Sequence, residues 1–429
     1  MDTQYWLITD PDDPRLEEAG RILREGGLVA FPTETVYGLG ANGLDEQAVA
    51  GIYEAKRRPG DNPLILHVSS TEEAKALASF PDGSSAWSEK AAAVAEAFWP
   101  GPLSMVLPAA SYIPRTVTAG LDTVAIRCPA DSIARALIHA AGVPVAAPSA
   151  NTSGKPSPTQ GSHVLEDMDG RIDLILDGGP CKVGIESTII DLSVEPPVIL
   201  RPGDITRDAL CAVLGEIRME GTLEIGQEQS PAQSFQEQQV EAQGARAGAG
   251  AAVQEAEKPE QTPKAPGLKY RHYAPNAPMI ILSGEVQSVA AYIQEQAAFQ
   301  EAGQPAKGDE SMQQQSSISE PAVEGMDLAW AQKKLGLLLS RDTWDGMPGL
   351  KSRLESQPQH YLCRDMGSRK NPWEMGSVLY EALRACNQGS VDMILVEACQ
   401  EQGQGAAVYN RLWKAAGGKV LYLSEDANL

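Results

Sequence analysis

Short hydrophobic runs alternate with longer amphipathic stretches in the first half of the chain, a pattern typical of interleaved strands and helices. Apolar residues recur at helical spacing over 14–25, over 84–98 and between a capping Asp45 and Lys56. Thr206 can cap a further helix. Because prolines stand at the ends of several apolar runs, we expect a mixed sheet rather than a regular parallel one. The runs predicted as strands are 28–31, 64–68, 103–107, 124–127, 143–147, 173–176, 187–192 and 198–200.

A similar alternation returns over residues 276–429 and predicts a second, smaller α/β domain of the Rossmann-like kind. The Gly-x-Gly-x-x-Gly sequence of dinucleotide-binding domains is missing, so no dinucleotide is assigned to it. A polar patch over 300–325 predicts a disordered loop. The expected strands are 279–282, 335–339, 361–363, 393–396 and 420–423, and the expected helices are 286–299, 374–386 and 409–416.

The two patterned regions, 1–218 and 276–429, are separated by a linker over 219–275. Up to about residue 266, Gln, Glu, Ala and Gly dominate the linker, a composition that cannot bury enough apolar surface to order itself. The segment 265–275 differs, because it carries two tyrosines, a histidine and two cations between prolines. It is either a docking segment that packs on the second domain or a segment that folds over a ligand.

Composition and charge narrow the class of protein. The chain has 429 residues, enough for two domains, and 42% of them are hydrophobic. The longest apolar runs fall short of the ~20 residues that cross a bilayer, and the first residues do not resemble a secretory signal. Six scattered cysteines form no Cys-x-x-Cys pair and are interpreted as reduced thiols of a cytoplasmic protein. A net charge of −22 disfavours tight, non-specific binding of nucleic acid.

In this acidic chain, the stretch 56–67 concentrates positive charge. Three consecutive cations, Lys56, Arg57 and Arg58, end a predicted helix, and an apolar run then delivers His67. Such a cluster indicates a local anion site. The alternative is that cations in a last helical turn only complement the helix dipole.

Polar loops and arginines follow several predicted strands. The loop 32–40 offers hydroxyls, a carboxylate and glycines at a sheet end, where α/β proteins place ligands. The segment 148–159 is rich in small and hydroxyl side chains, which allow a ligand to approach the backbone. Arg127 and Arg201 each end an apolar strand, and the planar guanidinium group suits carboxylate and phosphate oxygens. A polar turn and paired edge arginines are the alternatives.

Taken together, these motifs resemble the threonylcarbamoyl-AMP synthase family in its long, two-domain form. The resemblance implies a YrdC-like domain with a mixed twisted sheet and an open cavity, followed by the Rossmann-like domain. The linker and the 300–325 patch are longer than the family pattern. The matching segments are 31–39, 56–67, 99–103, 147–151, 186–189, 200–203 and 266–275, in the family's order.

The resemblance implies an enzyme that forms threonylcarbamoyl-AMP and pyrophosphate from L-threonine, bicarbonate and ATP. Mg²⁺ is expected with ATP, without a cage of protein carboxylates. The product would pass to a tRNA-modifying threonylcarbamoyl transferase complex, with weak or indirect contact to tRNA. Catalysis would rest on positioning and charge neutralisation rather than on a covalent nucleophile.

The resemblance also implies individual residue roles. The expected threonine ligands are Thr35, His67, Arg127 on the carboxylate, Ala147 through its backbone, and Ser187. The expected ATP ligands are Arg58, Asn62, Thr123, Ser149, Ser157, Arg201 and, from the linker, Tyr270. Charge and position add Asn151 to the ATP site and make Lys56, with Arg58, a candidate catalytic residue.

Two other functions compete with this hypothesis. A carbamoyltransferase of the hydrogenase-maturation kind contains a related domain, but it also carries Cys-x-x-Cys zinc motifs that this sequence lacks. An RNA-binding module is the second, and the acidic balance argues against it as the main role.

Overall fold

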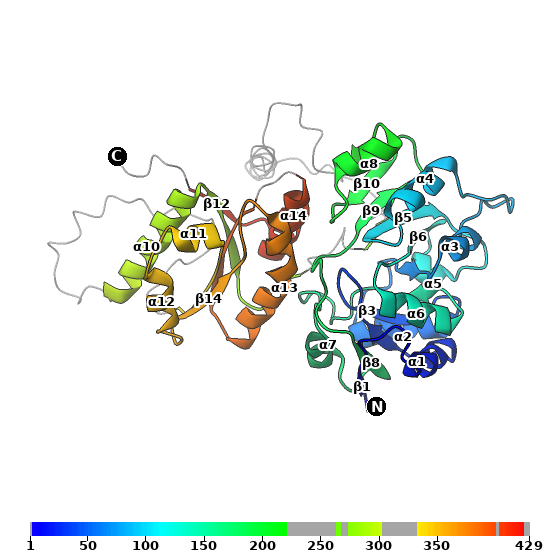
Figure 1. The fold of residues 1–429 in the computed structure, drawn as a ribbon, viewed down its shortest axis with the longest axis horizontal. Helices are drawn as coiled ribbons and strands as arrows, with labels where there is room; N and C mark the ends of the chain where they lie inside the picture. The colour runs from blue at the N-terminus through cyan, green and yellow to red at the C-terminus, as the bar shows by residue number, and fades with distance from the viewer. Residues whose placement is uncertain (1, 221–262, 267–272, 303–332, 400–402, 424–429) are drawn as a thin grey trace, which may run out of the picture.

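The computed structural model describes residues 2–220, 263–266, 273–302, 333–399 and 403–423. Figure 1 shows two lobes, each built on its own sheet. Residues 300–302 of the predicted loop 300–325 belong instead to helix α10 (Val286–Ala302). The rest of that loop, most of the linker, and Tyr270 lie outside the described residues. Within those residues, no helix has both the length and the apolar content that a membrane span needs.

The first lobe contains an 11-stranded sheet whose neighbours pair both parallel and antiparallel, so the prediction of a mixed sheet is confirmed. Its spatial order is β1 (Gln4–Leu7), β8 (Leu174–Asp177), β2 (Val29–Phe31), β3 (Gly38–Asn42), β7 (Val145–Ala146), β4 (Ile65–His67), β6 (Thr123–Arg127), β5 (Leu103–Pro108), β9 (Thr188–Asp191), β10 (Val198–Arg201) and β11 (Arg218–Met219).

Helices cover both faces of this sheet. Along β2, Val29 and Phe31 pack with the helices α1 and α6, whereas Ala30 between them faces the other apolar cluster, as the alternation of side chains in a strand requires. The side chains of Asp45 and Thr206 cap α2 and α8, as predicted. The helices are α1 (Arg15–Arg24), α2 (Glu46–Lys56), α3 (Thr71–Leu77), α4 (Glu89–Phe98), α5 (Arg115–Thr118), α6 (Ser132–Ala141), α7 (Gly161–Met168) and α8 (Arg207–Leu214).

One predicted loop is shorter than expected. The prediction of a loop over 32–40 was wrong at its end, because Gly38 begins β3, which pairs antiparallel with β2. A side chain at Gly40 would lie 2.9 Å from the Phe31 ring and 2.8 Å from Val145, so glycine is required for this close packing. The glycines that suggested a loop therefore mark a tightly packed strand.

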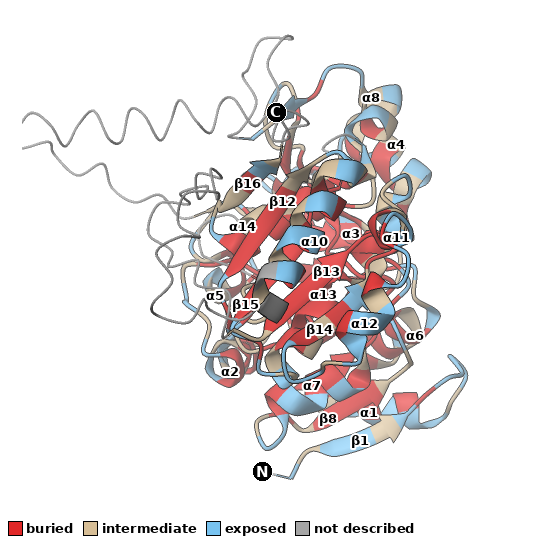
Figure 2. Ribbon diagram, turned by 90° about the vertical axis from the view of Figure 1, so that its left-hand side faces the viewer, coloured by how far each residue is buried: buried red, intermediate tan, exposed pale blue. Residues whose placement is uncertain are grey.

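The second lobe is a parallel α/β sandwich, which confirms the Rossmann-like prediction. Its five strands lie in the order β14 (Tyr361–Asp365), β13 (Leu335–Leu339), β15 (Met393–Glu397), β12 (Met279–Gly284) and β16 (Val420–Leu423), and every neighbouring pair is parallel. Helices α10 (Val286–Ala302), α11 (Arg341–Asp345) and α12 (Leu350–Glu355) cover the outer face. Figure 2 shows the buried strands β12 and β13 behind these partly exposed helices.

The inner face of the second sheet carries α13 (Pro372–Gln388) and α14 (Gln404–Ala416), which lie against the first lobe (Figure 1). Their apolar residues Leu379 and Val408 belong to one buried cluster with Val36 and Val183 of the first lobe. The two domains therefore share a continuous apolar core at their interface.

Gly184 lies at the closest approach of the two domains. It has φ +80°, and a Cβ there would lie 2.5 Å from the Cα of Ser377 in α13. We expect Gly184→Ala to combine left-handed strain with overpacking and to lower the free energy of unfolding by roughly 1–3 kcal/mol more than strain alone. Gly179→Ala is the matched control, because Gly179 has φ +85° with nothing within 4 Å of its Cβ position. Equal losses in urea denaturation would show that the interface does not restrict position 184.

Candidate active site

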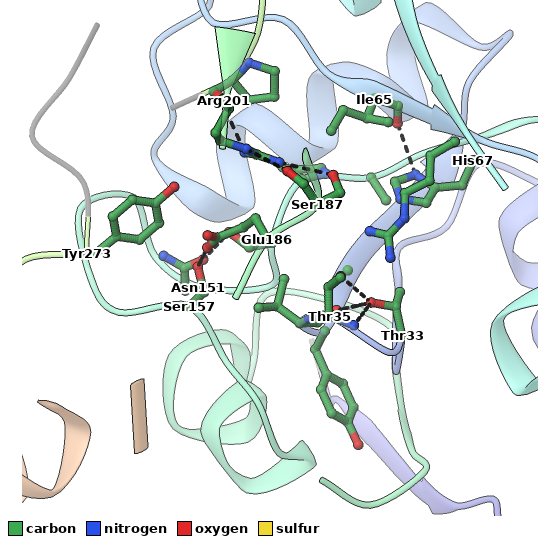
Figure 3. Close-up of a pocket in the computed structure, with 18 of the residues that line it drawn as sticks. Thr33, Thr35, Ile65, His67, Asn151, Ser157, Glu186, Ser187, Arg201 and Tyr273 are labelled. Atoms are coloured by element: carbon green, nitrogen blue, oxygen red, sulfur yellow. Dashed lines mark hydrogen bonds between the residues drawn. The ribbon is translucent and has the colours of Figure 1, made fainter. Parts of the chain in front are cut away.

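A cavity opens in the first lobe where several strands end and the linker returns (Figure 3). Four cations line it, and among the lining residues that the structure describes Glu186 is the one carboxylate. The polar residues that line it are Thr33, Thr35, Tyr37, Arg58, His67, Arg127, Ser149, Asn151, Lys155, Ser157, Glu186, Ser187, Arg201 and Tyr273. A lining with this excess of positive charge suits anionic ligands.

The loop before β3 holds Thr35 in place. The Oγ1 of Thr33 accepts hydrogen bonds from the backbone N–H groups of Thr35 and Val36, at 3.1 and 3.2 Å, and donates to the carbonyl of Val36 at 2.7 Å. The two threonine hydroxyl oxygens lie 2.8 Å apart. This compact turn fixes the buried hydroxyl of Thr35 at the cavity wall.

His67 and Arg127 are brought together by sheet register, because β4 and β6 pair with these residues opposite each other. Burial and the charge of Arg127 lower the pKa of His67 to about 3, so its imidazole is neutral near pH 7. Its Nδ1 lies 3.2 Å from the carbonyl oxygen of Ile65. A proton on Nδ1 satisfies that contact and leaves Nε2 as an acceptor.

Glu34 balances the charge of Arg127. The two side chains form a buried ion pair of 2.8 Å, and the Nε of Arg127 donates to the carbonyl of Gly101 at 3.4 Å. Burial opposes ionisation of Glu34, but the charge of Arg127 and the hydrogen bonds to the carboxylate together outweigh it, and the pKa of Glu34 lies below its usual value. The buried guanidinium of Arg127 thus has a counter-ion at the cavity before any substrate binds.

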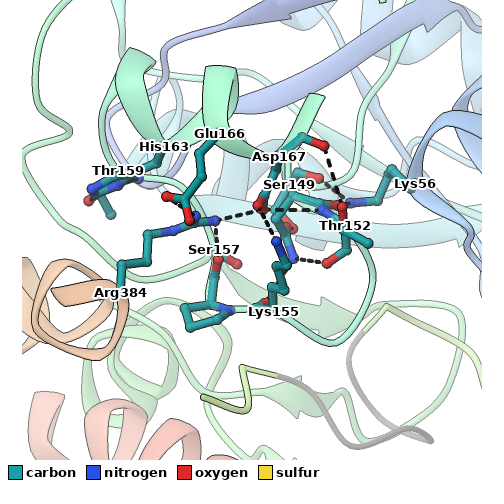
Figure 4. Close-up of polar contacts among 12 residues, drawn as sticks. Lys56, Ser149, Thr152, Lys155, Ser157, Thr159, His163, Glu166, Asp167 and Arg384 are labelled. Carbon is teal, nitrogen blue, oxygen red and sulfur yellow. Dashed lines mark hydrogen bonds and ion pairs between the residues drawn. The ribbon is translucent and has the colours of Figure 1, made fainter. Parts of the chain in front are cut away.

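Two cations at the C-terminal end of helix α2, Lys56 and Arg58, occupy different positions relative to the cavity. Arg58 lines the cavity and donates to the carbonyls of Asn62 and Pro63, at 3.3 and 3.0 Å, and burial lowers its pKa to about 10. Lys56 is fully buried behind the cavity, and its ammonium donates to the carbonyls of Ser149 and Asn151 (Figure 4). Its position favours support of the 149–151 loop over the direct catalytic role expected from the sequence.

The opposite wall carries two sets of hydrogen bonds, one between Arg201 and Ser187 and one between Ser157 and Glu186. Arg201 donates to the carbonyl and hydroxyl oxygens of Ser187, at 3.1 and 3.2 Å, and to the carbonyl of Pro266 in the linker at 3.3 Å. The hydroxyl of Ser157 donates to Glu186 at 2.6 Å (Figure 3). Side chains from three separate segments are therefore locked around one wall of the cavity.

Comparison with known proteins identifies the family. A family model described as "Telomere recombination" matches residues 21–203, and one described as "Threonylcarbamoyl-AMP synthase, C-terminal domain" matches residues 235–417. A protein named threonylcarbamoyl-AMP synthase from Pyrococcus abyssi is 40% identical over 95% of this chain and 97% of its own. The chain belongs to the threonylcarbamoyl-AMP synthase family.

Two further relatives agree with this family assignment. The threonylcarbamoyl-AMP synthase of Bacillus subtilis is 37% identical over 98% of this chain and 100% of its own. The crystal structure of P. abyssi Sua5 complexed with L-threonine superposes with a TM-score of 0.72 at 38% identity, covering 98% of this chain and 99% of that one. The two-domain fold expected from the resemblance is thus that of the family.

The structure brings together most of the residues that the resemblance implied, although their individual roles stay predictions. The cavity is lined by Thr35, Arg58, His67, Arg127, Ala147, Ser149, Asn151, Ser157, Ser187 and Arg201. Asn62 and Thr123 are not among the lining residues, and Tyr270 lies outside the described part of the chain. The N–H of Ala147 donates to the carbonyl of Ile65, so the backbone group it would offer a substrate is its carbonyl.

Sequence reasoning did not name Thr33, Glu34, Tyr37, Lys155, Glu186 and Tyr273 as residues of the site. Glu34 and Glu186 stand inside motifs that carried the family resemblance, and that position was the available signal. Tyr273 belongs to the linker segment 265–275 and reaches the cavity three residues after Tyr270. The described residue Tyr273 therefore lines the cavity and also packs on the second domain, as the docking interpretation predicted, while folding of the segment over a ligand stays a prediction.

The buried neutral His67 makes a testable contribution to stability. Below an unfolded-state pKa of about 6.5, the unfolded chain binds a proton that folded His67 excludes down to about pH 3. This contribution is fully present above pH ~6.5 and is lost as the pH falls. We expect the natural chain to lose about 2 kcal/mol more unfolding free energy than His67→Gln on going from pH 7 to pH 5. If urea titrations at the two pH values showed the same loss of unfolding free energy for the natural chain and for His67→Gln, His67 would take up its proton in the folded state as readily as in the unfolded chain.

Proposed function

We propose that this chain forms threonylcarbamoyl-AMP and pyrophosphate from L-threonine, bicarbonate and ATP. The observation that carries the proposal is a cavity lined by four cations, a neutral histidine and several hydroxyls in a chain of net charge −22. Family membership supports it, as does the relative whose crystal structure contains L-threonine.

The side of the cavity around β4 and β6 suits an amino acid. Arg127 can present its planar guanidinium to the threonine carboxylate. The hydroxyls of Thr35 and Ser187 and the Nε2 acceptor of neutral His67 can satisfy the polar groups of threonine. Because His67 carries no charge near pH 7, it adds no repulsion to the neighbouring Arg127.

The other side suits a nucleotide triphosphate. Arg58, Lys155 and Arg201 can neutralise its phosphates. The hydroxyls of Ser149 and Ser157 donate to Asn151 and Glu186, so on this side they offer their oxygen atoms as acceptors. The threonine amine and bicarbonate give a carbamate and water. A carbamate oxygen then bonds to the α-phosphorus of ATP, and the bond from that phosphorus to the pyrophosphate oxygen breaks. Holding both anions in contact supplies the catalysis.

Mg²⁺ is proposed to accompany ATP. Over the described ranges, no group of three or more His, Cys, Asp or Glu side chains could hold a metal ion, and Glu34 and Glu186 are already paired with arginines. These residues fit an ion held by phosphate oxygens and water rather than by a protein cage. The ion would offset phosphate charge during transfer.

The product is proposed to serve a tRNA-modifying threonylcarbamoyl transferase complex in the cytoplasm. Direct binding of tRNA by this chain is disfavoured by its acidic charge.

The direct test is pyrophosphate release by the purified chain with each substrate omitted in turn. We expect release only when L-threonine, bicarbonate and ATP are all present. ATP consumption that continues without threonine would contradict the proposal, and salt-dependent retention of tRNA without such release would favour an RNA-binding protein.

The threonine side can be tested separately from the ATP side. Replacing Arg127 alone would strand the buried Glu34 carboxylate, so both charges are removed together in Arg127→Met/Glu34→Gln. We expect the Kd of threonine in isothermal titration to rise about 10- to 100-fold, because a charge-assisted bond is lost. The Kd of ATP should change less than about threefold. Glu34→Gln alone is the control, and equal losses for both substrates would exclude the assigned role of Arg127.

A further inference from the structure

The carboxylate of Glu186 is an anomaly in a cavity built for anions. It faces the cavity together with Arg58, Lys155 and Arg201, and a phosphate bound among these cations would be repelled by an uncompensated charge on Glu186. The carboxylate is 7% exposed. A buried charge of this kind requires a partner.

The partner comes from the other domain. Arg411 of α14, 0% exposed, donates its Nε to Oε2 of Glu186 at 3.1 Å. Tyr380 of α13 donates its hydroxyl to the same carboxylate, with oxygen distances of 2.9 and 3.0 Å. Burial opposes ionisation of Glu186, but the charges of Arg411 and Arg201 outweigh it and hold its pKa below the usual value. The only carboxylate among the described lining residues is thus neutralised from outside its own domain.

Arg411 also holds the backbone on both sides of the site. One terminal nitrogen donates to the carbonyl of Glu186, directly before Ser187, at 3.3 Å. The other donates to the carbonyl of Pro202, directly after Arg201. The side chain of Arg411 therefore connects the backbone directly before β9, which presents Ser187 to the cavity, with the end of β10, which presents Arg201.

The same guanidinium contacts the linker. Its central carbon lies 6.0 Å from the ring centre of Tyr273, which stacks on Tyr380 with ring centres 5.4 Å apart. Tyr273 lines the cavity (Figure 3). The contacts of Arg411 thus join the C-terminal domain, the linker and the active-site wall.

We propose that Arg411 is a positioning residue for the reaction, which neutralises Glu186 inside the cavity and fixes the backbone that presents Ser187 and Arg201. The inference rests on the proposed function for its substrates. It assigns the C-terminal domain a task in substrate binding beyond packing.

The test compares Arg411→Met, Glu186→Gln and the double variant in the full-length chain. We expect Arg411→Met to raise the KM for ATP about tenfold or more, because an uncompensated carboxylate then faces the phosphates. Adding Glu186→Gln removes that charge and should return the KM to within about threefold of Glu186→Gln alone. The Kd of a non-hydrolysable ATP analogue, measured by calorimetry, should follow the same order.

Arg384→Met is the matched control. Arg384, 2% exposed, also crosses the interface, where it donates to Asp167 at 2.9 Å and to the carbonyl of Pro156 at 2.6 Å (Figure 4). If Arg411 only joined the domains, the two variants would lose melting temperature and ATP affinity alike, and Glu186→Gln would rescue neither. We expect Glu186→Gln to restore the ATP affinity of Arg411→Met but not that of Arg384→Met.

Two outcomes overturn the inference: an unchanged ATP affinity in Arg411→Met, or a loss that Glu186→Gln does not restore. If Arg411→Met fails to fold, Tyr380→Phe removes one donor to Glu186 with little change in volume, and Glu186→Gln should again reverse its weaker loss of affinity. An inactive natural chain would refute the proposed function, whereas the affinity of the analogue would still decide the role of Arg411.

Discussion

The active site depends on burying basic side chains among hydrogen-bond acceptors. Lys56, Arg201, Arg384 and Arg411 are each at most 5% exposed. Each donates to backbone carbonyl oxygens of the loops around the cavity, and Arg384 and Arg411 also meet carboxylates. Such bonds replace hydration and at the same time fix the carbonyl-bearing loops. The contacts that replace the hydration of these side chains are therefore also the contacts that hold the loops in place.

This constraint explains why the two domains form one unit. The helices α13 and α14 bring the side chains of Tyr380, Arg384 and Arg411 into contact with Glu186, which lines the cavity of the first domain, and with Pro156, which precedes the lining residue Ser157. Loss of any one of these contacts would leave a polar group buried without its partner, which costs more than the pair contributes. The apolar cluster shared across the interface includes Tyr380, so it adjoins these polar contacts.

Local signals made most of the fold predictable from the sequence. The cap at Asp45 and the apolar run 64–68 that delivers His67 both lie within a few residues of what they specify. By contrast, the partner of Glu186 lies 225 residues away, and no periodic pattern reports which helix face meets another domain. The orientation of the Lys56 side chain could not be predicted for the same reason, because its carbonyl partners, Ser149 and Asn151, lie far from it in the sequence.

We propose that threonine, once carbamoylated, is joined to the innermost phosphorus of ATP in this cavity. The most direct measurement is the mass of the adenylate formed from ATP, L-threonine and ¹³C-bicarbonate. We expect a threonine-containing adenylate that is heavier by one mass unit than the product made with ordinary bicarbonate. A threonyl adenylate without the labelled carbon, or an adenylate without threonine, would contradict it.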